Sequence, residues 1–245
     1  MASALVCAVA AWLRRCCRVV AAAQRLLKEE SLAQKAEYLT LAGDCEAQGE
    51  FEDRRSRFIA QLCQVTSERE ANEFISVVRA RHHDARHNVP AWILSDGREK
   101  RSDDGEPQGT AGQPVLEVLR GAGLQDVCCV VTRYFGGVKL GPGGLVRAYT
   151  AATQEAVAAA QAGQKVVTMT LVTRVTVVMP YAAYGRVERL VADCRGKVRD
   201  TIFSEDVQLT ANFRTGDEQA FVAAMRELAN GDDLCTVGEP RFAEF

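Results

Sequence analysis

The stretch between residues 127 and 162 limits the possible folds more than any other part of the chain. Residues 127–132 form an uninterrupted apolar run, typical of a strand buried on both faces of its sheet. A turn with five glycines follows, and a long helix is predicted from Gly143 because apolar side chains recur there at helical spacing. The stripe consists of Leu145, Ala148, Tyr149, Ala152 and Ala156. We therefore expect an α+β domain around this strand.

Neighbouring segments complete a first domain, for which we predict the boundaries 49–163. A strand is expected over 57–65, and a Ser-x-x-Glu capping box starting at Ser67 predicts the beginning of a helix. A second strand is predicted over 89–94 and a short helix over 113–120.

The order of elements changes after Gly163, and residues 164–245 are predicted to form a second domain. The predicted strands span 168–178, 197–203, 206–214 and 234–238, with one helix around 187–194 and another around 221–228. Apolar and polar residues alternate over 207–214, which indicates a sheet with one buried and one solvent-exposed face. This β-α-β-β-α-β order is typical of a ferredoxin-like domain.

The first 28 residues contain five basic side chains and no acidic one. On a helix, Arg14, Arg15, Arg18, Arg25 and Lys28 fall on one side and apolar residues on the other. Such a helix is typical of mitochondrial targeting, and it would equally suit contact with RNA or a membrane surface, or be a plain surface helix. We expect residues 1–48 to be an N-terminal extension and linker, and we favour a mitochondrial over a cytoplasmic location.

Charge and cysteine content exclude several classes of protein. Thirty Lys and Arg residues against 32 Asp and Glu residues give a net charge of −2, so any basic surface must be local. Nine cysteines without a C-x-x-C pair predict reduced thiols rather than a disulfide framework or a zinc ribbon. No apolar run reaches the ~20 residues that a bilayer-spanning helix needs, so we expect no integral membrane association.

All three histidines, His82, His83 and His87, lie within six residues at the predicted end of a helix. Together with Asp84 they could bind Zn²⁺, because imidazole and carboxylate are ligands of transition metals. Histidines at a helix C-terminus also interact favourably with the helix dipole and cap its carbonyl groups. We favour this structural role and predict no metal site.

Three carboxylates, Asp103, Asp104 and Glu106, fall within four residues of a loop that spans 102–112. They could hold Mg²⁺ or act as acid and base, and the small residues after them could present N–H groups to an anion. A solvated turn is the alternative. We favour a functional surface without catalytic residues.

The turn after the buried strand has the composition of an anion-binding site. Its glycines are Gly136, Gly137, Gly141, Gly143 and Gly144, and the neighbouring cations are Arg133, Lys139 and Arg147. Glycines allow a close backbone approach, and a helix N-terminus favours negative charge. Neither the P-loop nor the dinucleotide-binding pattern is present. Phosphates of RNA or of a small nucleotide would fit, with Tyr134, Phe135 or Tyr149 available for stacking. Tight core packing is the alternative explanation for these residues.

Four motifs, in residues 56–58, 84–92, 102–112 and 133–149, together resemble the IMPACT/YigZ family. The motif residues outside the glycine turn are Arg57, Asp84, Arg86, His87, Ser102, Asp103, Asp104, Gly105, Glu106, Pro107, Gly109, Thr110 and Gly112. The resemblance implies a first domain similar to domain 2 of ribosomal protein S5 and a second similar to domain V of elongation factor G. Both folds occur in the translation machinery.

The resemblance also implies a role in translation. Eukaryotic relatives bind the Gcn1 activator of the Gcn2 kinase and carry an N-terminal RWD domain for this. The residues before position 49 are too few for an RWD domain, so we do not expect Gcn1 binding.

We predict a non-enzymatic, translation-associated protein that binds RNA or a ribosomal particle without a cofactor. The expected contacts to RNA phosphates come from Arg133, Lys139, Arg147 and the glycine turn. A protein partner is expected on the second domain, and a mitochondrial location would make the mitochondrial ribosome or its assembly intermediate the natural target. The alternatives are a Mg-dependent enzyme acting on a phosphorylated small molecule or nucleotide, and a pure protein adaptor.

Overall fold

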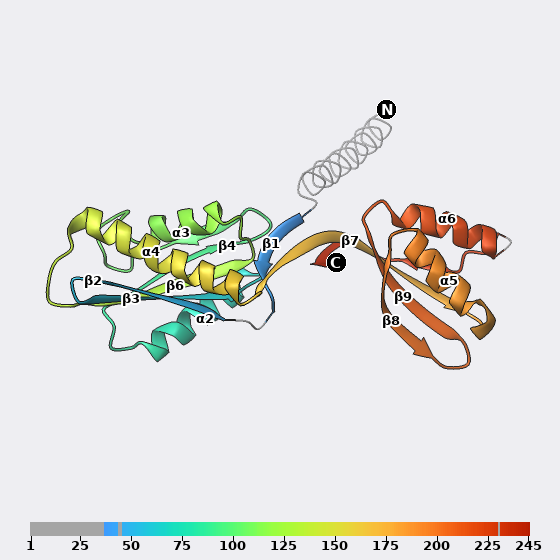
Figure 1. Ribbon diagram of the computed structural model, residues 1–245, viewed down its shortest axis with the longest axis horizontal. Helices are drawn as coiled ribbons and strands as arrows, with labels where there is room; N and C mark the ends of the chain where they lie inside the picture. The colour runs from blue at the N-terminus through green and yellow to red at the C-terminus, as the bar shows by residue number, and fades with distance from the viewer. Residues whose placement is uncertain (1–36, 44–45, 230) are drawn as a thin grey trace, which may run out of the picture. The chain divides into compact units, whose positions relative to one another are not determined.

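The computed structural model describes residues 37–43, 46–229 and 231–245, which form two α+β domains (Figure 1). The basic helix expected over the first 28 residues lies outside the described residues. Among the residues that are described, no helix combines the length and apolar character needed to cross a membrane.

The first domain contains a five-stranded sheet in which all neighbouring strands are antiparallel. The order across this sheet is β2 (Ala47–Asp53), β3 (Ser56–Gln64), β6 (Val127–Tyr134), β4 (His87–Ile93) and β5 (Glu99–Arg101). β6 is the central strand, and each of its residues before Tyr134 is buried.

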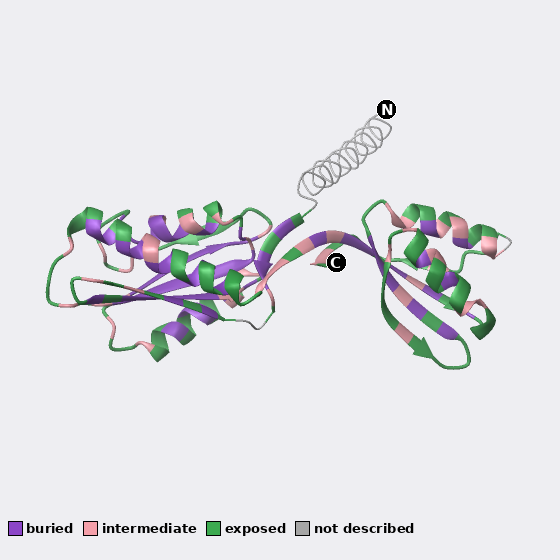
Figure 2. Ribbon diagram, in the orientation of Figure 1, coloured by how far each residue is buried: buried purple, intermediate pink, exposed green. Residues whose placement is uncertain are grey.

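Helices cover both faces of this sheet. α3 (Gly112–Gly121) and α4 (Gly141–Ala162) lie on one face, and α2 (Glu68–Arg81) lies on the other (Figure 1). Successive residues of β6 therefore enter different cores: Cys129 packs with the residues of α3 and α4, and Cys128 packs with those of α2. Figure 2 shows buried residues along the central strands and exposed residues on the outer sides of the helices. The prediction of a strand buried on both faces is confirmed.

The predicted start of α2 is also confirmed, with one difference in detail. The side chain of Ser67 accepts a hydrogen bond from the backbone nitrogen of Glu70, as the capping box predicts. The Glu70 carboxylate, however, accepts from the backbone nitrogen of Thr66 at 2.8 Å instead of from Ser67. These bonds satisfy backbone donors at and just before the helix N-terminus.

The second domain has the predicted ferredoxin-like arrangement. Its strands lie in the order β10 (Cys235–Val237), β7 (Val166–Met179), β9 (Val207–Arg214) and β8 (Lys197–Phe203), with all neighbours antiparallel. α5 (Tyr181–Asp193) and α6 (Glu218–Leu228) provide the helical residues of its core. The alternating residues Val207, Leu209, Ala211 and Phe213 face this core, which explains their spacing.

Two further strands pair with β7 and were not predicted. β1 (Glu37–Leu41) and β11 (Arg241–Glu244) both join its sheet. The expectation that residues up to 48 are an extension or linker is therefore wrong for β1 and for the first residues of β2. A buried hydrogen bond from the Tyr38 hydroxyl to the Asp126 carboxylate fixes β1 beside the start of β6.

Candidate functional site

One end of the central strands brings the four sequence motifs together. In the register of the sheet, Arg133 lies opposite Phe58 on β3 and opposite His87 on β4. The turn after β6 returns to β3, because the backbone nitrogen of Gly136 donates to Ser56 Oγ at 3.1 Å. The loop of residues 102–112, called the acidic loop below, contacts β6 through an ion pair between Glu106 and Arg133. Residues far apart in the sequence thus form one surface.

Asp103 organises the acidic loop rather than facing a ligand. Its carboxylate accepts hydrogen bonds from the backbone nitrogens of Gly109, Ala111 and Gly112, at 2.8, 3.2 and 2.8 Å. Burial raises the pKa of Asp103, but these three N–H donors outweigh burial, so the pKa lies below its ordinary value. Asp103 therefore closes the loop and fixes the beginning of α3.

Asp104 connects the loop to α2 and β4. Its carboxylate pairs with Arg79 at 2.8 Å and accepts from the backbone nitrogen of Asn88 at 2.7 Å. Its carbonyl oxygen lies 2.8 Å from His87 Nδ1, so this nitrogen carries a hydrogen and donates it. Asp104 and Gly105 both have positive φ angles, of 45° and 87°, which turn the chain sharply between Asp103 and Glu106.

Glu106 is the centre of a buried polar cluster. Its Oε1 accepts from Arg133 Nη1 at 2.6 Å and from the Tyr149 hydroxyl at 2.9 Å, and His87 Nε2 lies 4.0 Å away. The side chains of Arg133 and Glu106 are only 8% and 4% exposed. Burial, followed by the Glu106 charge, raises the pKa of Tyr149, so its hydroxyl stays protonated and donates.

The Arg133 guanidinium makes cation–π contacts with two aromatic rings. It lies 5.5 Å from the ring centre of Phe58 and 5.6 Å from that of Phe135. Its Nε is buried and has no hydrogen-bond partner within the described part of the chain. The sequence suggested that Arg133 contacts RNA phosphates; the structure pairs this side chain with Glu106 and places both residues in the lining of the cavity described below.

The glycines of the turn serve different purposes. A Cβ atom at Gly136 would lie 2.0 Å from the carbonyl carbon of Arg55, so Gly136 is needed for the contact between this turn and the β2–β3 turn. Gly137 and Gly141 have positive φ angles of 87° and 71°. Gly143 has neither constraint, because a Cβ atom there would meet nothing within 4 Å. Internal packing therefore explains Gly136 but does not explain Gly143.

A cavity of about 410 Å³ opens between the acidic loop and the turn after β6. Its lining includes Gly141 and Pro142 at the start of α4, together with Arg86, Lys139 and the ring of Phe135. Arg86 and Lys139 are exposed and form no ion pair with any described residue. Two free cations beside a helix N-terminus favour a negatively charged ligand.

Two further arginines, Arg54 and Arg55, extend this positive surface. They occupy the β2–β3 turn, which Gly136 contacts, and both are exposed without an ion pair among the described residues. Arg57, on the adjoining strand β3, is paired with Glu50 at 2.8 Å and is therefore less available to a negatively charged ligand. Sequence reasoning missed Arg54 and Arg55, although two adjacent arginines beside a family motif were a visible signal.

The other predicted cations and aromatic residues are placed as follows. Arg147 is exposed on α4 but does not line the cavity. Phe135 is 51% exposed, whereas Tyr149 is fully buried and therefore cannot stack on a base. Gly144 is also buried, close to Leu140.

The histidines belong to separate hydrogen-bond networks. His82 Nε2 lies 3.0 Å from Gln61 Nε2, and His82 Nδ1 lies 2.9 Å from the Tyr134 hydroxyl. This hydroxyl in turn donates to Asp84 at 3.0 Å. Burial lowers the pKa of His82 and so favours its neutral form. Within the described ranges, no three His, Cys, Asp or Glu side chains are grouped as metal ligands.

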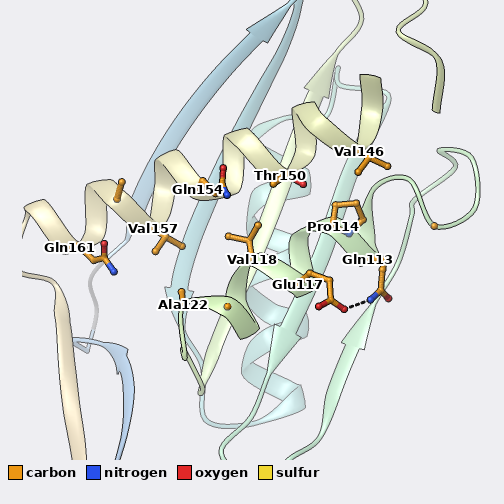
Figure 3. Close-up of a pocket in the computed structure, with 13 residues that line it drawn as sticks. Gln113, Pro114, Glu117, Val118, Ala122, Val146, Thr150, Gln154, Val157 and Gln161 are labelled. Atoms are coloured by element: carbon orange, nitrogen blue, oxygen red, sulfur yellow. Dashed lines mark hydrogen bonds between the residues drawn. The ribbon is translucent and has the colours of Figure 1, made fainter. Parts of the chain in front are cut away.

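A second cavity, of about 690 Å³, is a groove between α3 and α4 (Figure 3). Val118, Val146 and Val157 lie along it, and Glu117 is the one charged residue in its lining. The Glu117 carboxylate is already bonded to Gln113 and Arg120. Because the described residues that line this groove include no cation, it does not suit a phosphate, and we assign the candidate site to the smaller cavity.

Comparison with known proteins agrees with the arrangement of motifs. The family model of the Impact N-terminal domain matches residues 54–157, and that of a domain of unknown function, DUF1949, matches residues 177–232. IMPACT family member YvyE of Bacillus subtilis (strain 168) is 38% identical over 192 residues, covering 78% of this chain and 87% of YvyE. The chain belongs to the IMPACT family.

Other members of the IMPACT family are similar over much the same length. IMPACT family member YigZ of Escherichia coli (strain K12) is 34% identical over 184 residues, which cover 74% of this chain and 88% of YigZ. A crystal structure described as that of a hypothetical protein is 30% identical, with a TM-score of 0.55 over 86% of this chain and 98% of that chain. Both the family and its two-domain α+β fold are therefore as the motifs predicted.

Proposed function

We propose that this IMPACT-family protein is a non-enzymatic, translation-associated protein that binds RNA through the first domain. The binding surface is defined by Arg54, Arg55, Arg86, Lys139 and Phe135, and is called the basic cavity surface below. The observation that carries the proposal is a cavity at the N-terminus of α4 whose lining includes Arg86 and Lys139, both exposed and without an ion pair among the described residues, with Arg54 and Arg55 on the neighbouring β2–β3 turn.

The groups on this surface match the chemistry of single-stranded RNA. Cations and helix N-termini bind phosphate groups, and an exposed aromatic ring can stack on a base. One face of Phe135 rests over the Arg133 guanidinium, which supports the ring while the side chain remains 51% exposed. In this proposal, the Arg133–Glu106 pair shapes the site and Arg86 and Lys139 contact the ligand.

The alternative of a Mg-dependent enzyme depended on three carboxylates that face one anion site. The structure separates them: Asp103 binds backbone nitrogens, Asp104 binds Arg79, and Glu106 binds Arg133. Calorimetric titration of the full chain with ATP or GTP and Mg²⁺ tests this alternative directly. Heat of binding at millimolar nucleotide that is lost in Glu106→Gln would favour the enzyme over the RNA-binding protein.

A separate observation supports a protein partner on the second domain. Val178 on β7 and Ile202 on β8 both lie opposite Gln208 of β9, so they share one face of the sheet. They are 48% and 50% exposed, on the face away from the core side chains of β9. This exposed apolar pair is suited to contact with a protein and would complement RNA binding by the first domain.

We further propose that the protein associates with a ribosomal particle, that of mitochondria if the basic N-terminal segment directs it there. The test is sedimentation of the tagged full chain from separated mitochondrial and cytosolic extracts, with ribosomal RNA followed in the same fractions. Comigration with a ribosomal particle that is lost at high salt supports the proposal. A tag confined to the top of both gradients contradicts it and favours a ribosome-independent adaptor.

A further inference from the structure

The cavity between the acidic loop and the turn after β6 is lined by more cations than carboxylates. Apart from His87, its charged lining residues are Arg86, Arg133, Lys139 and Glu106. Glu106 is already paired with Arg133, whereas Arg86 and Lys139 are exposed and form no ion pair with any described residue. A ligand that neutralises both of these free cations carries about two negative charges.

Arg133 adds hydrogen-bond donors that the protein itself leaves unused. A guanidinium has five N–H groups, and among the described residues the side chain of Arg133 forms one hydrogen bond, from Nη1 to Glu106. The side chain is 8% exposed, and its buried Nε has no partner in the described part of the chain. Unpaired buried donors cost free energy and are uncommon in folded proteins. A ligand with several acceptor oxygens is therefore the kind that suits Arg133.

The start of α4 presents further donors to the same cavity. No side chain caps the N-terminus of this 22-residue helix, whose N-cap residue is Leu140. The N–H groups of Gly141 and Gly143 precede the first intrahelical hydrogen bond, and Pro142 has no N–H group. Gly141 and Pro142 line the cavity, so the positive end of the helix dipole lies beside the free cations.

The size and charge of the cavity together select one kind of phosphate. Its volume of about 410 Å³ is typical of a site for one small molecule, not for several nucleotides of a chain. An internal phosphodiester carries one negative charge, whereas a terminal phosphate monoester carries about −1.5 to −2 at pH 7 and has three acceptor oxygens. The terminal group matches the two free cations and the unused donors of Arg133.

We propose that this cavity binds the terminal phosphate monoester of a nucleotide, either at the end of an RNA chain or on a free nucleotide. The inference rests on the proposed function and makes it more specific, because the RNA is then held by its end. Arg86 and Lys139 bind the phosphate oxygens, and the exposed ring of Phe135 stacks on the terminal base. Arg54 and Arg55, which lie outside the lining, contact phosphates farther along the chain.

Competition between RNAs with different ends tests this inference on the full chain. A labelled single-stranded RNA without terminal phosphates is displaced, in an anisotropy assay, by unlabelled RNA of the same sequence. The three RNA competitors carry a 5′-phosphate, a 3′-phosphate or no terminal phosphate, and AMP is the fourth competitor. We expect one phosphorylated RNA to compete about tenfold or more better than the unphosphorylated RNA, because hydrogen bonds between charged groups are strong.

The AMP competitor distinguishes the two sources of the phosphate. AMP that competes as well as the better phosphorylated RNA assigns the cavity to free nucleotides, and AMP that competes less well assigns it to RNA ends. Equal competition by the three RNAs would overturn the inference and leave RNA binding by the basic cavity surface in place.

Two double variants locate the phosphate. Arg86→Ala/Lys139→Ala should abolish the preference for a phosphorylated end. Arg54→Asn/Arg55→Asn is the matched control, because it removes two cations outside the cavity and asparagine tolerates their positive φ angles of 46° and 62°. It should weaken all three RNAs by a similar factor and keep the preference. A preference that survives in the first variant or disappears in the second would contradict the placement.

Failure of the proposed function would give a different result. If the labelled RNA does not bind at all, the RNA-binding proposal fails, and the melting temperature with and without AMP tests the cavity alone. A rise with AMP that is absent in Arg86→Ala/Lys139→Ala would still support a phosphate site. No rise in the wild-type protein would overturn it.

Discussion

Arg133 and Glu106 form an ion pair of 2.6 Å that is almost completely shielded from water and joins the end of β6 to the acidic loop. Tyr149 from α4 donates to the same carboxylate oxygen. Strand, loop and helix therefore meet at one atom, Glu106 Oε1. This explains how an acidic loop and a glycine-rich turn, which are separate in sequence, can form the two sides of one cavity.

Removal of Glu106 should destabilise the first domain strongly. In Glu106→Ala, Arg133 stays buried without its counter-ion, so we expect a loss of about 3–5 kcal/mol in the free energy of unfolding. Urea unfolding followed by circular dichroism measures this. Glu117→Ala removes an exposed carboxylate paired with Arg120 and should cost under about 1 kcal/mol. Equal losses of unfolding free energy in the two variants would mean that the buried Arg133–Glu106 pair stabilises the domain no more than the exposed Arg120–Glu117 pair does.

Substitutions in the glycine turn should distinguish a glycine that packing requires, Gly136, from one that packing does not require, Gly143. Gly136→Ala places a Cβ atom against the Arg55 backbone and should cost about 1–3 kcal/mol or more. Gly143→Ala meets open space at the start of α4, so we expect stability to be unchanged or raised. The melting temperatures of both variants, measured in parallel, test this. A larger loss in Gly143→Ala than in Gly136→Ala would contradict the description of the turn.

Asp103 should contribute stability that depends on pH. Its pKa is lowered in the folded protein, so the contribution is fully present above the unfolded pKa and is lost as the pH falls through the folded pKa. At pH 7, Asp103→Asn should lower the free energy of unfolding by about 1.5–3 kcal/mol, because hydrogen bonds to a charged acceptor are lost. The difference from wild type should narrow on acidification. A difference that is constant from pH 7 down to about pH 3 would show that ionisation of Asp103 plays no part.

The exposed ring of Phe135 should contribute to RNA affinity more than to stability. Phe135→Ala should weaken binding of single-stranded RNA by about 1–3 kcal/mol, the range measured for a base stacked on an aromatic side chain. Fluorescence anisotropy with a labelled RNA measures the loss. Phe203→Ala is a suitable control, because Phe203 is 58% exposed in the second domain. If both variants bind like wild type, Phe135 is not a stacking platform.

The parts of the fold that sequence analysis found are those with a strong local pattern. The alternation over 207–214 and the apolar run of β6 were both visible because each follows from burial of one or both faces. β2 was missed because its core-facing positions are Ala47, Gly49 and Phe51, and two of these three side chains are small or absent. A Cβ atom at Gly49 would lie 2.1 Å from the backbone of Ala156, a contact that no local pattern reveals.

The site was predicted less completely than the fold, for a similar reason. The motifs identified the residue types, but not which carboxylate would pair with which cation. Arg133 was expected to contact RNA phosphates because it lies beside the glycine turn with Lys139 and Arg147, and only the folded chain places Glu106 next to it. Tyr149 was considered for stacking, although its position on the apolar stripe of α4 already favoured the core.

The salt dependence of RNA binding tests the central proposal most directly. Anisotropy titrations of a labelled single-stranded RNA between about 50 and 200 mM KCl give the slope of log K against log salt. Arg86→Ala/Lys139→Ala should weaken binding and reduce this slope by about 1.4. The matched variant Arg69→Ala/Lys100→Ala, which removes two exposed cations already paired with Glu73 and Glu68, should keep the wild-type slope. Equal slopes in all three proteins, or no RNA binding at the lowest salt, would contradict the account.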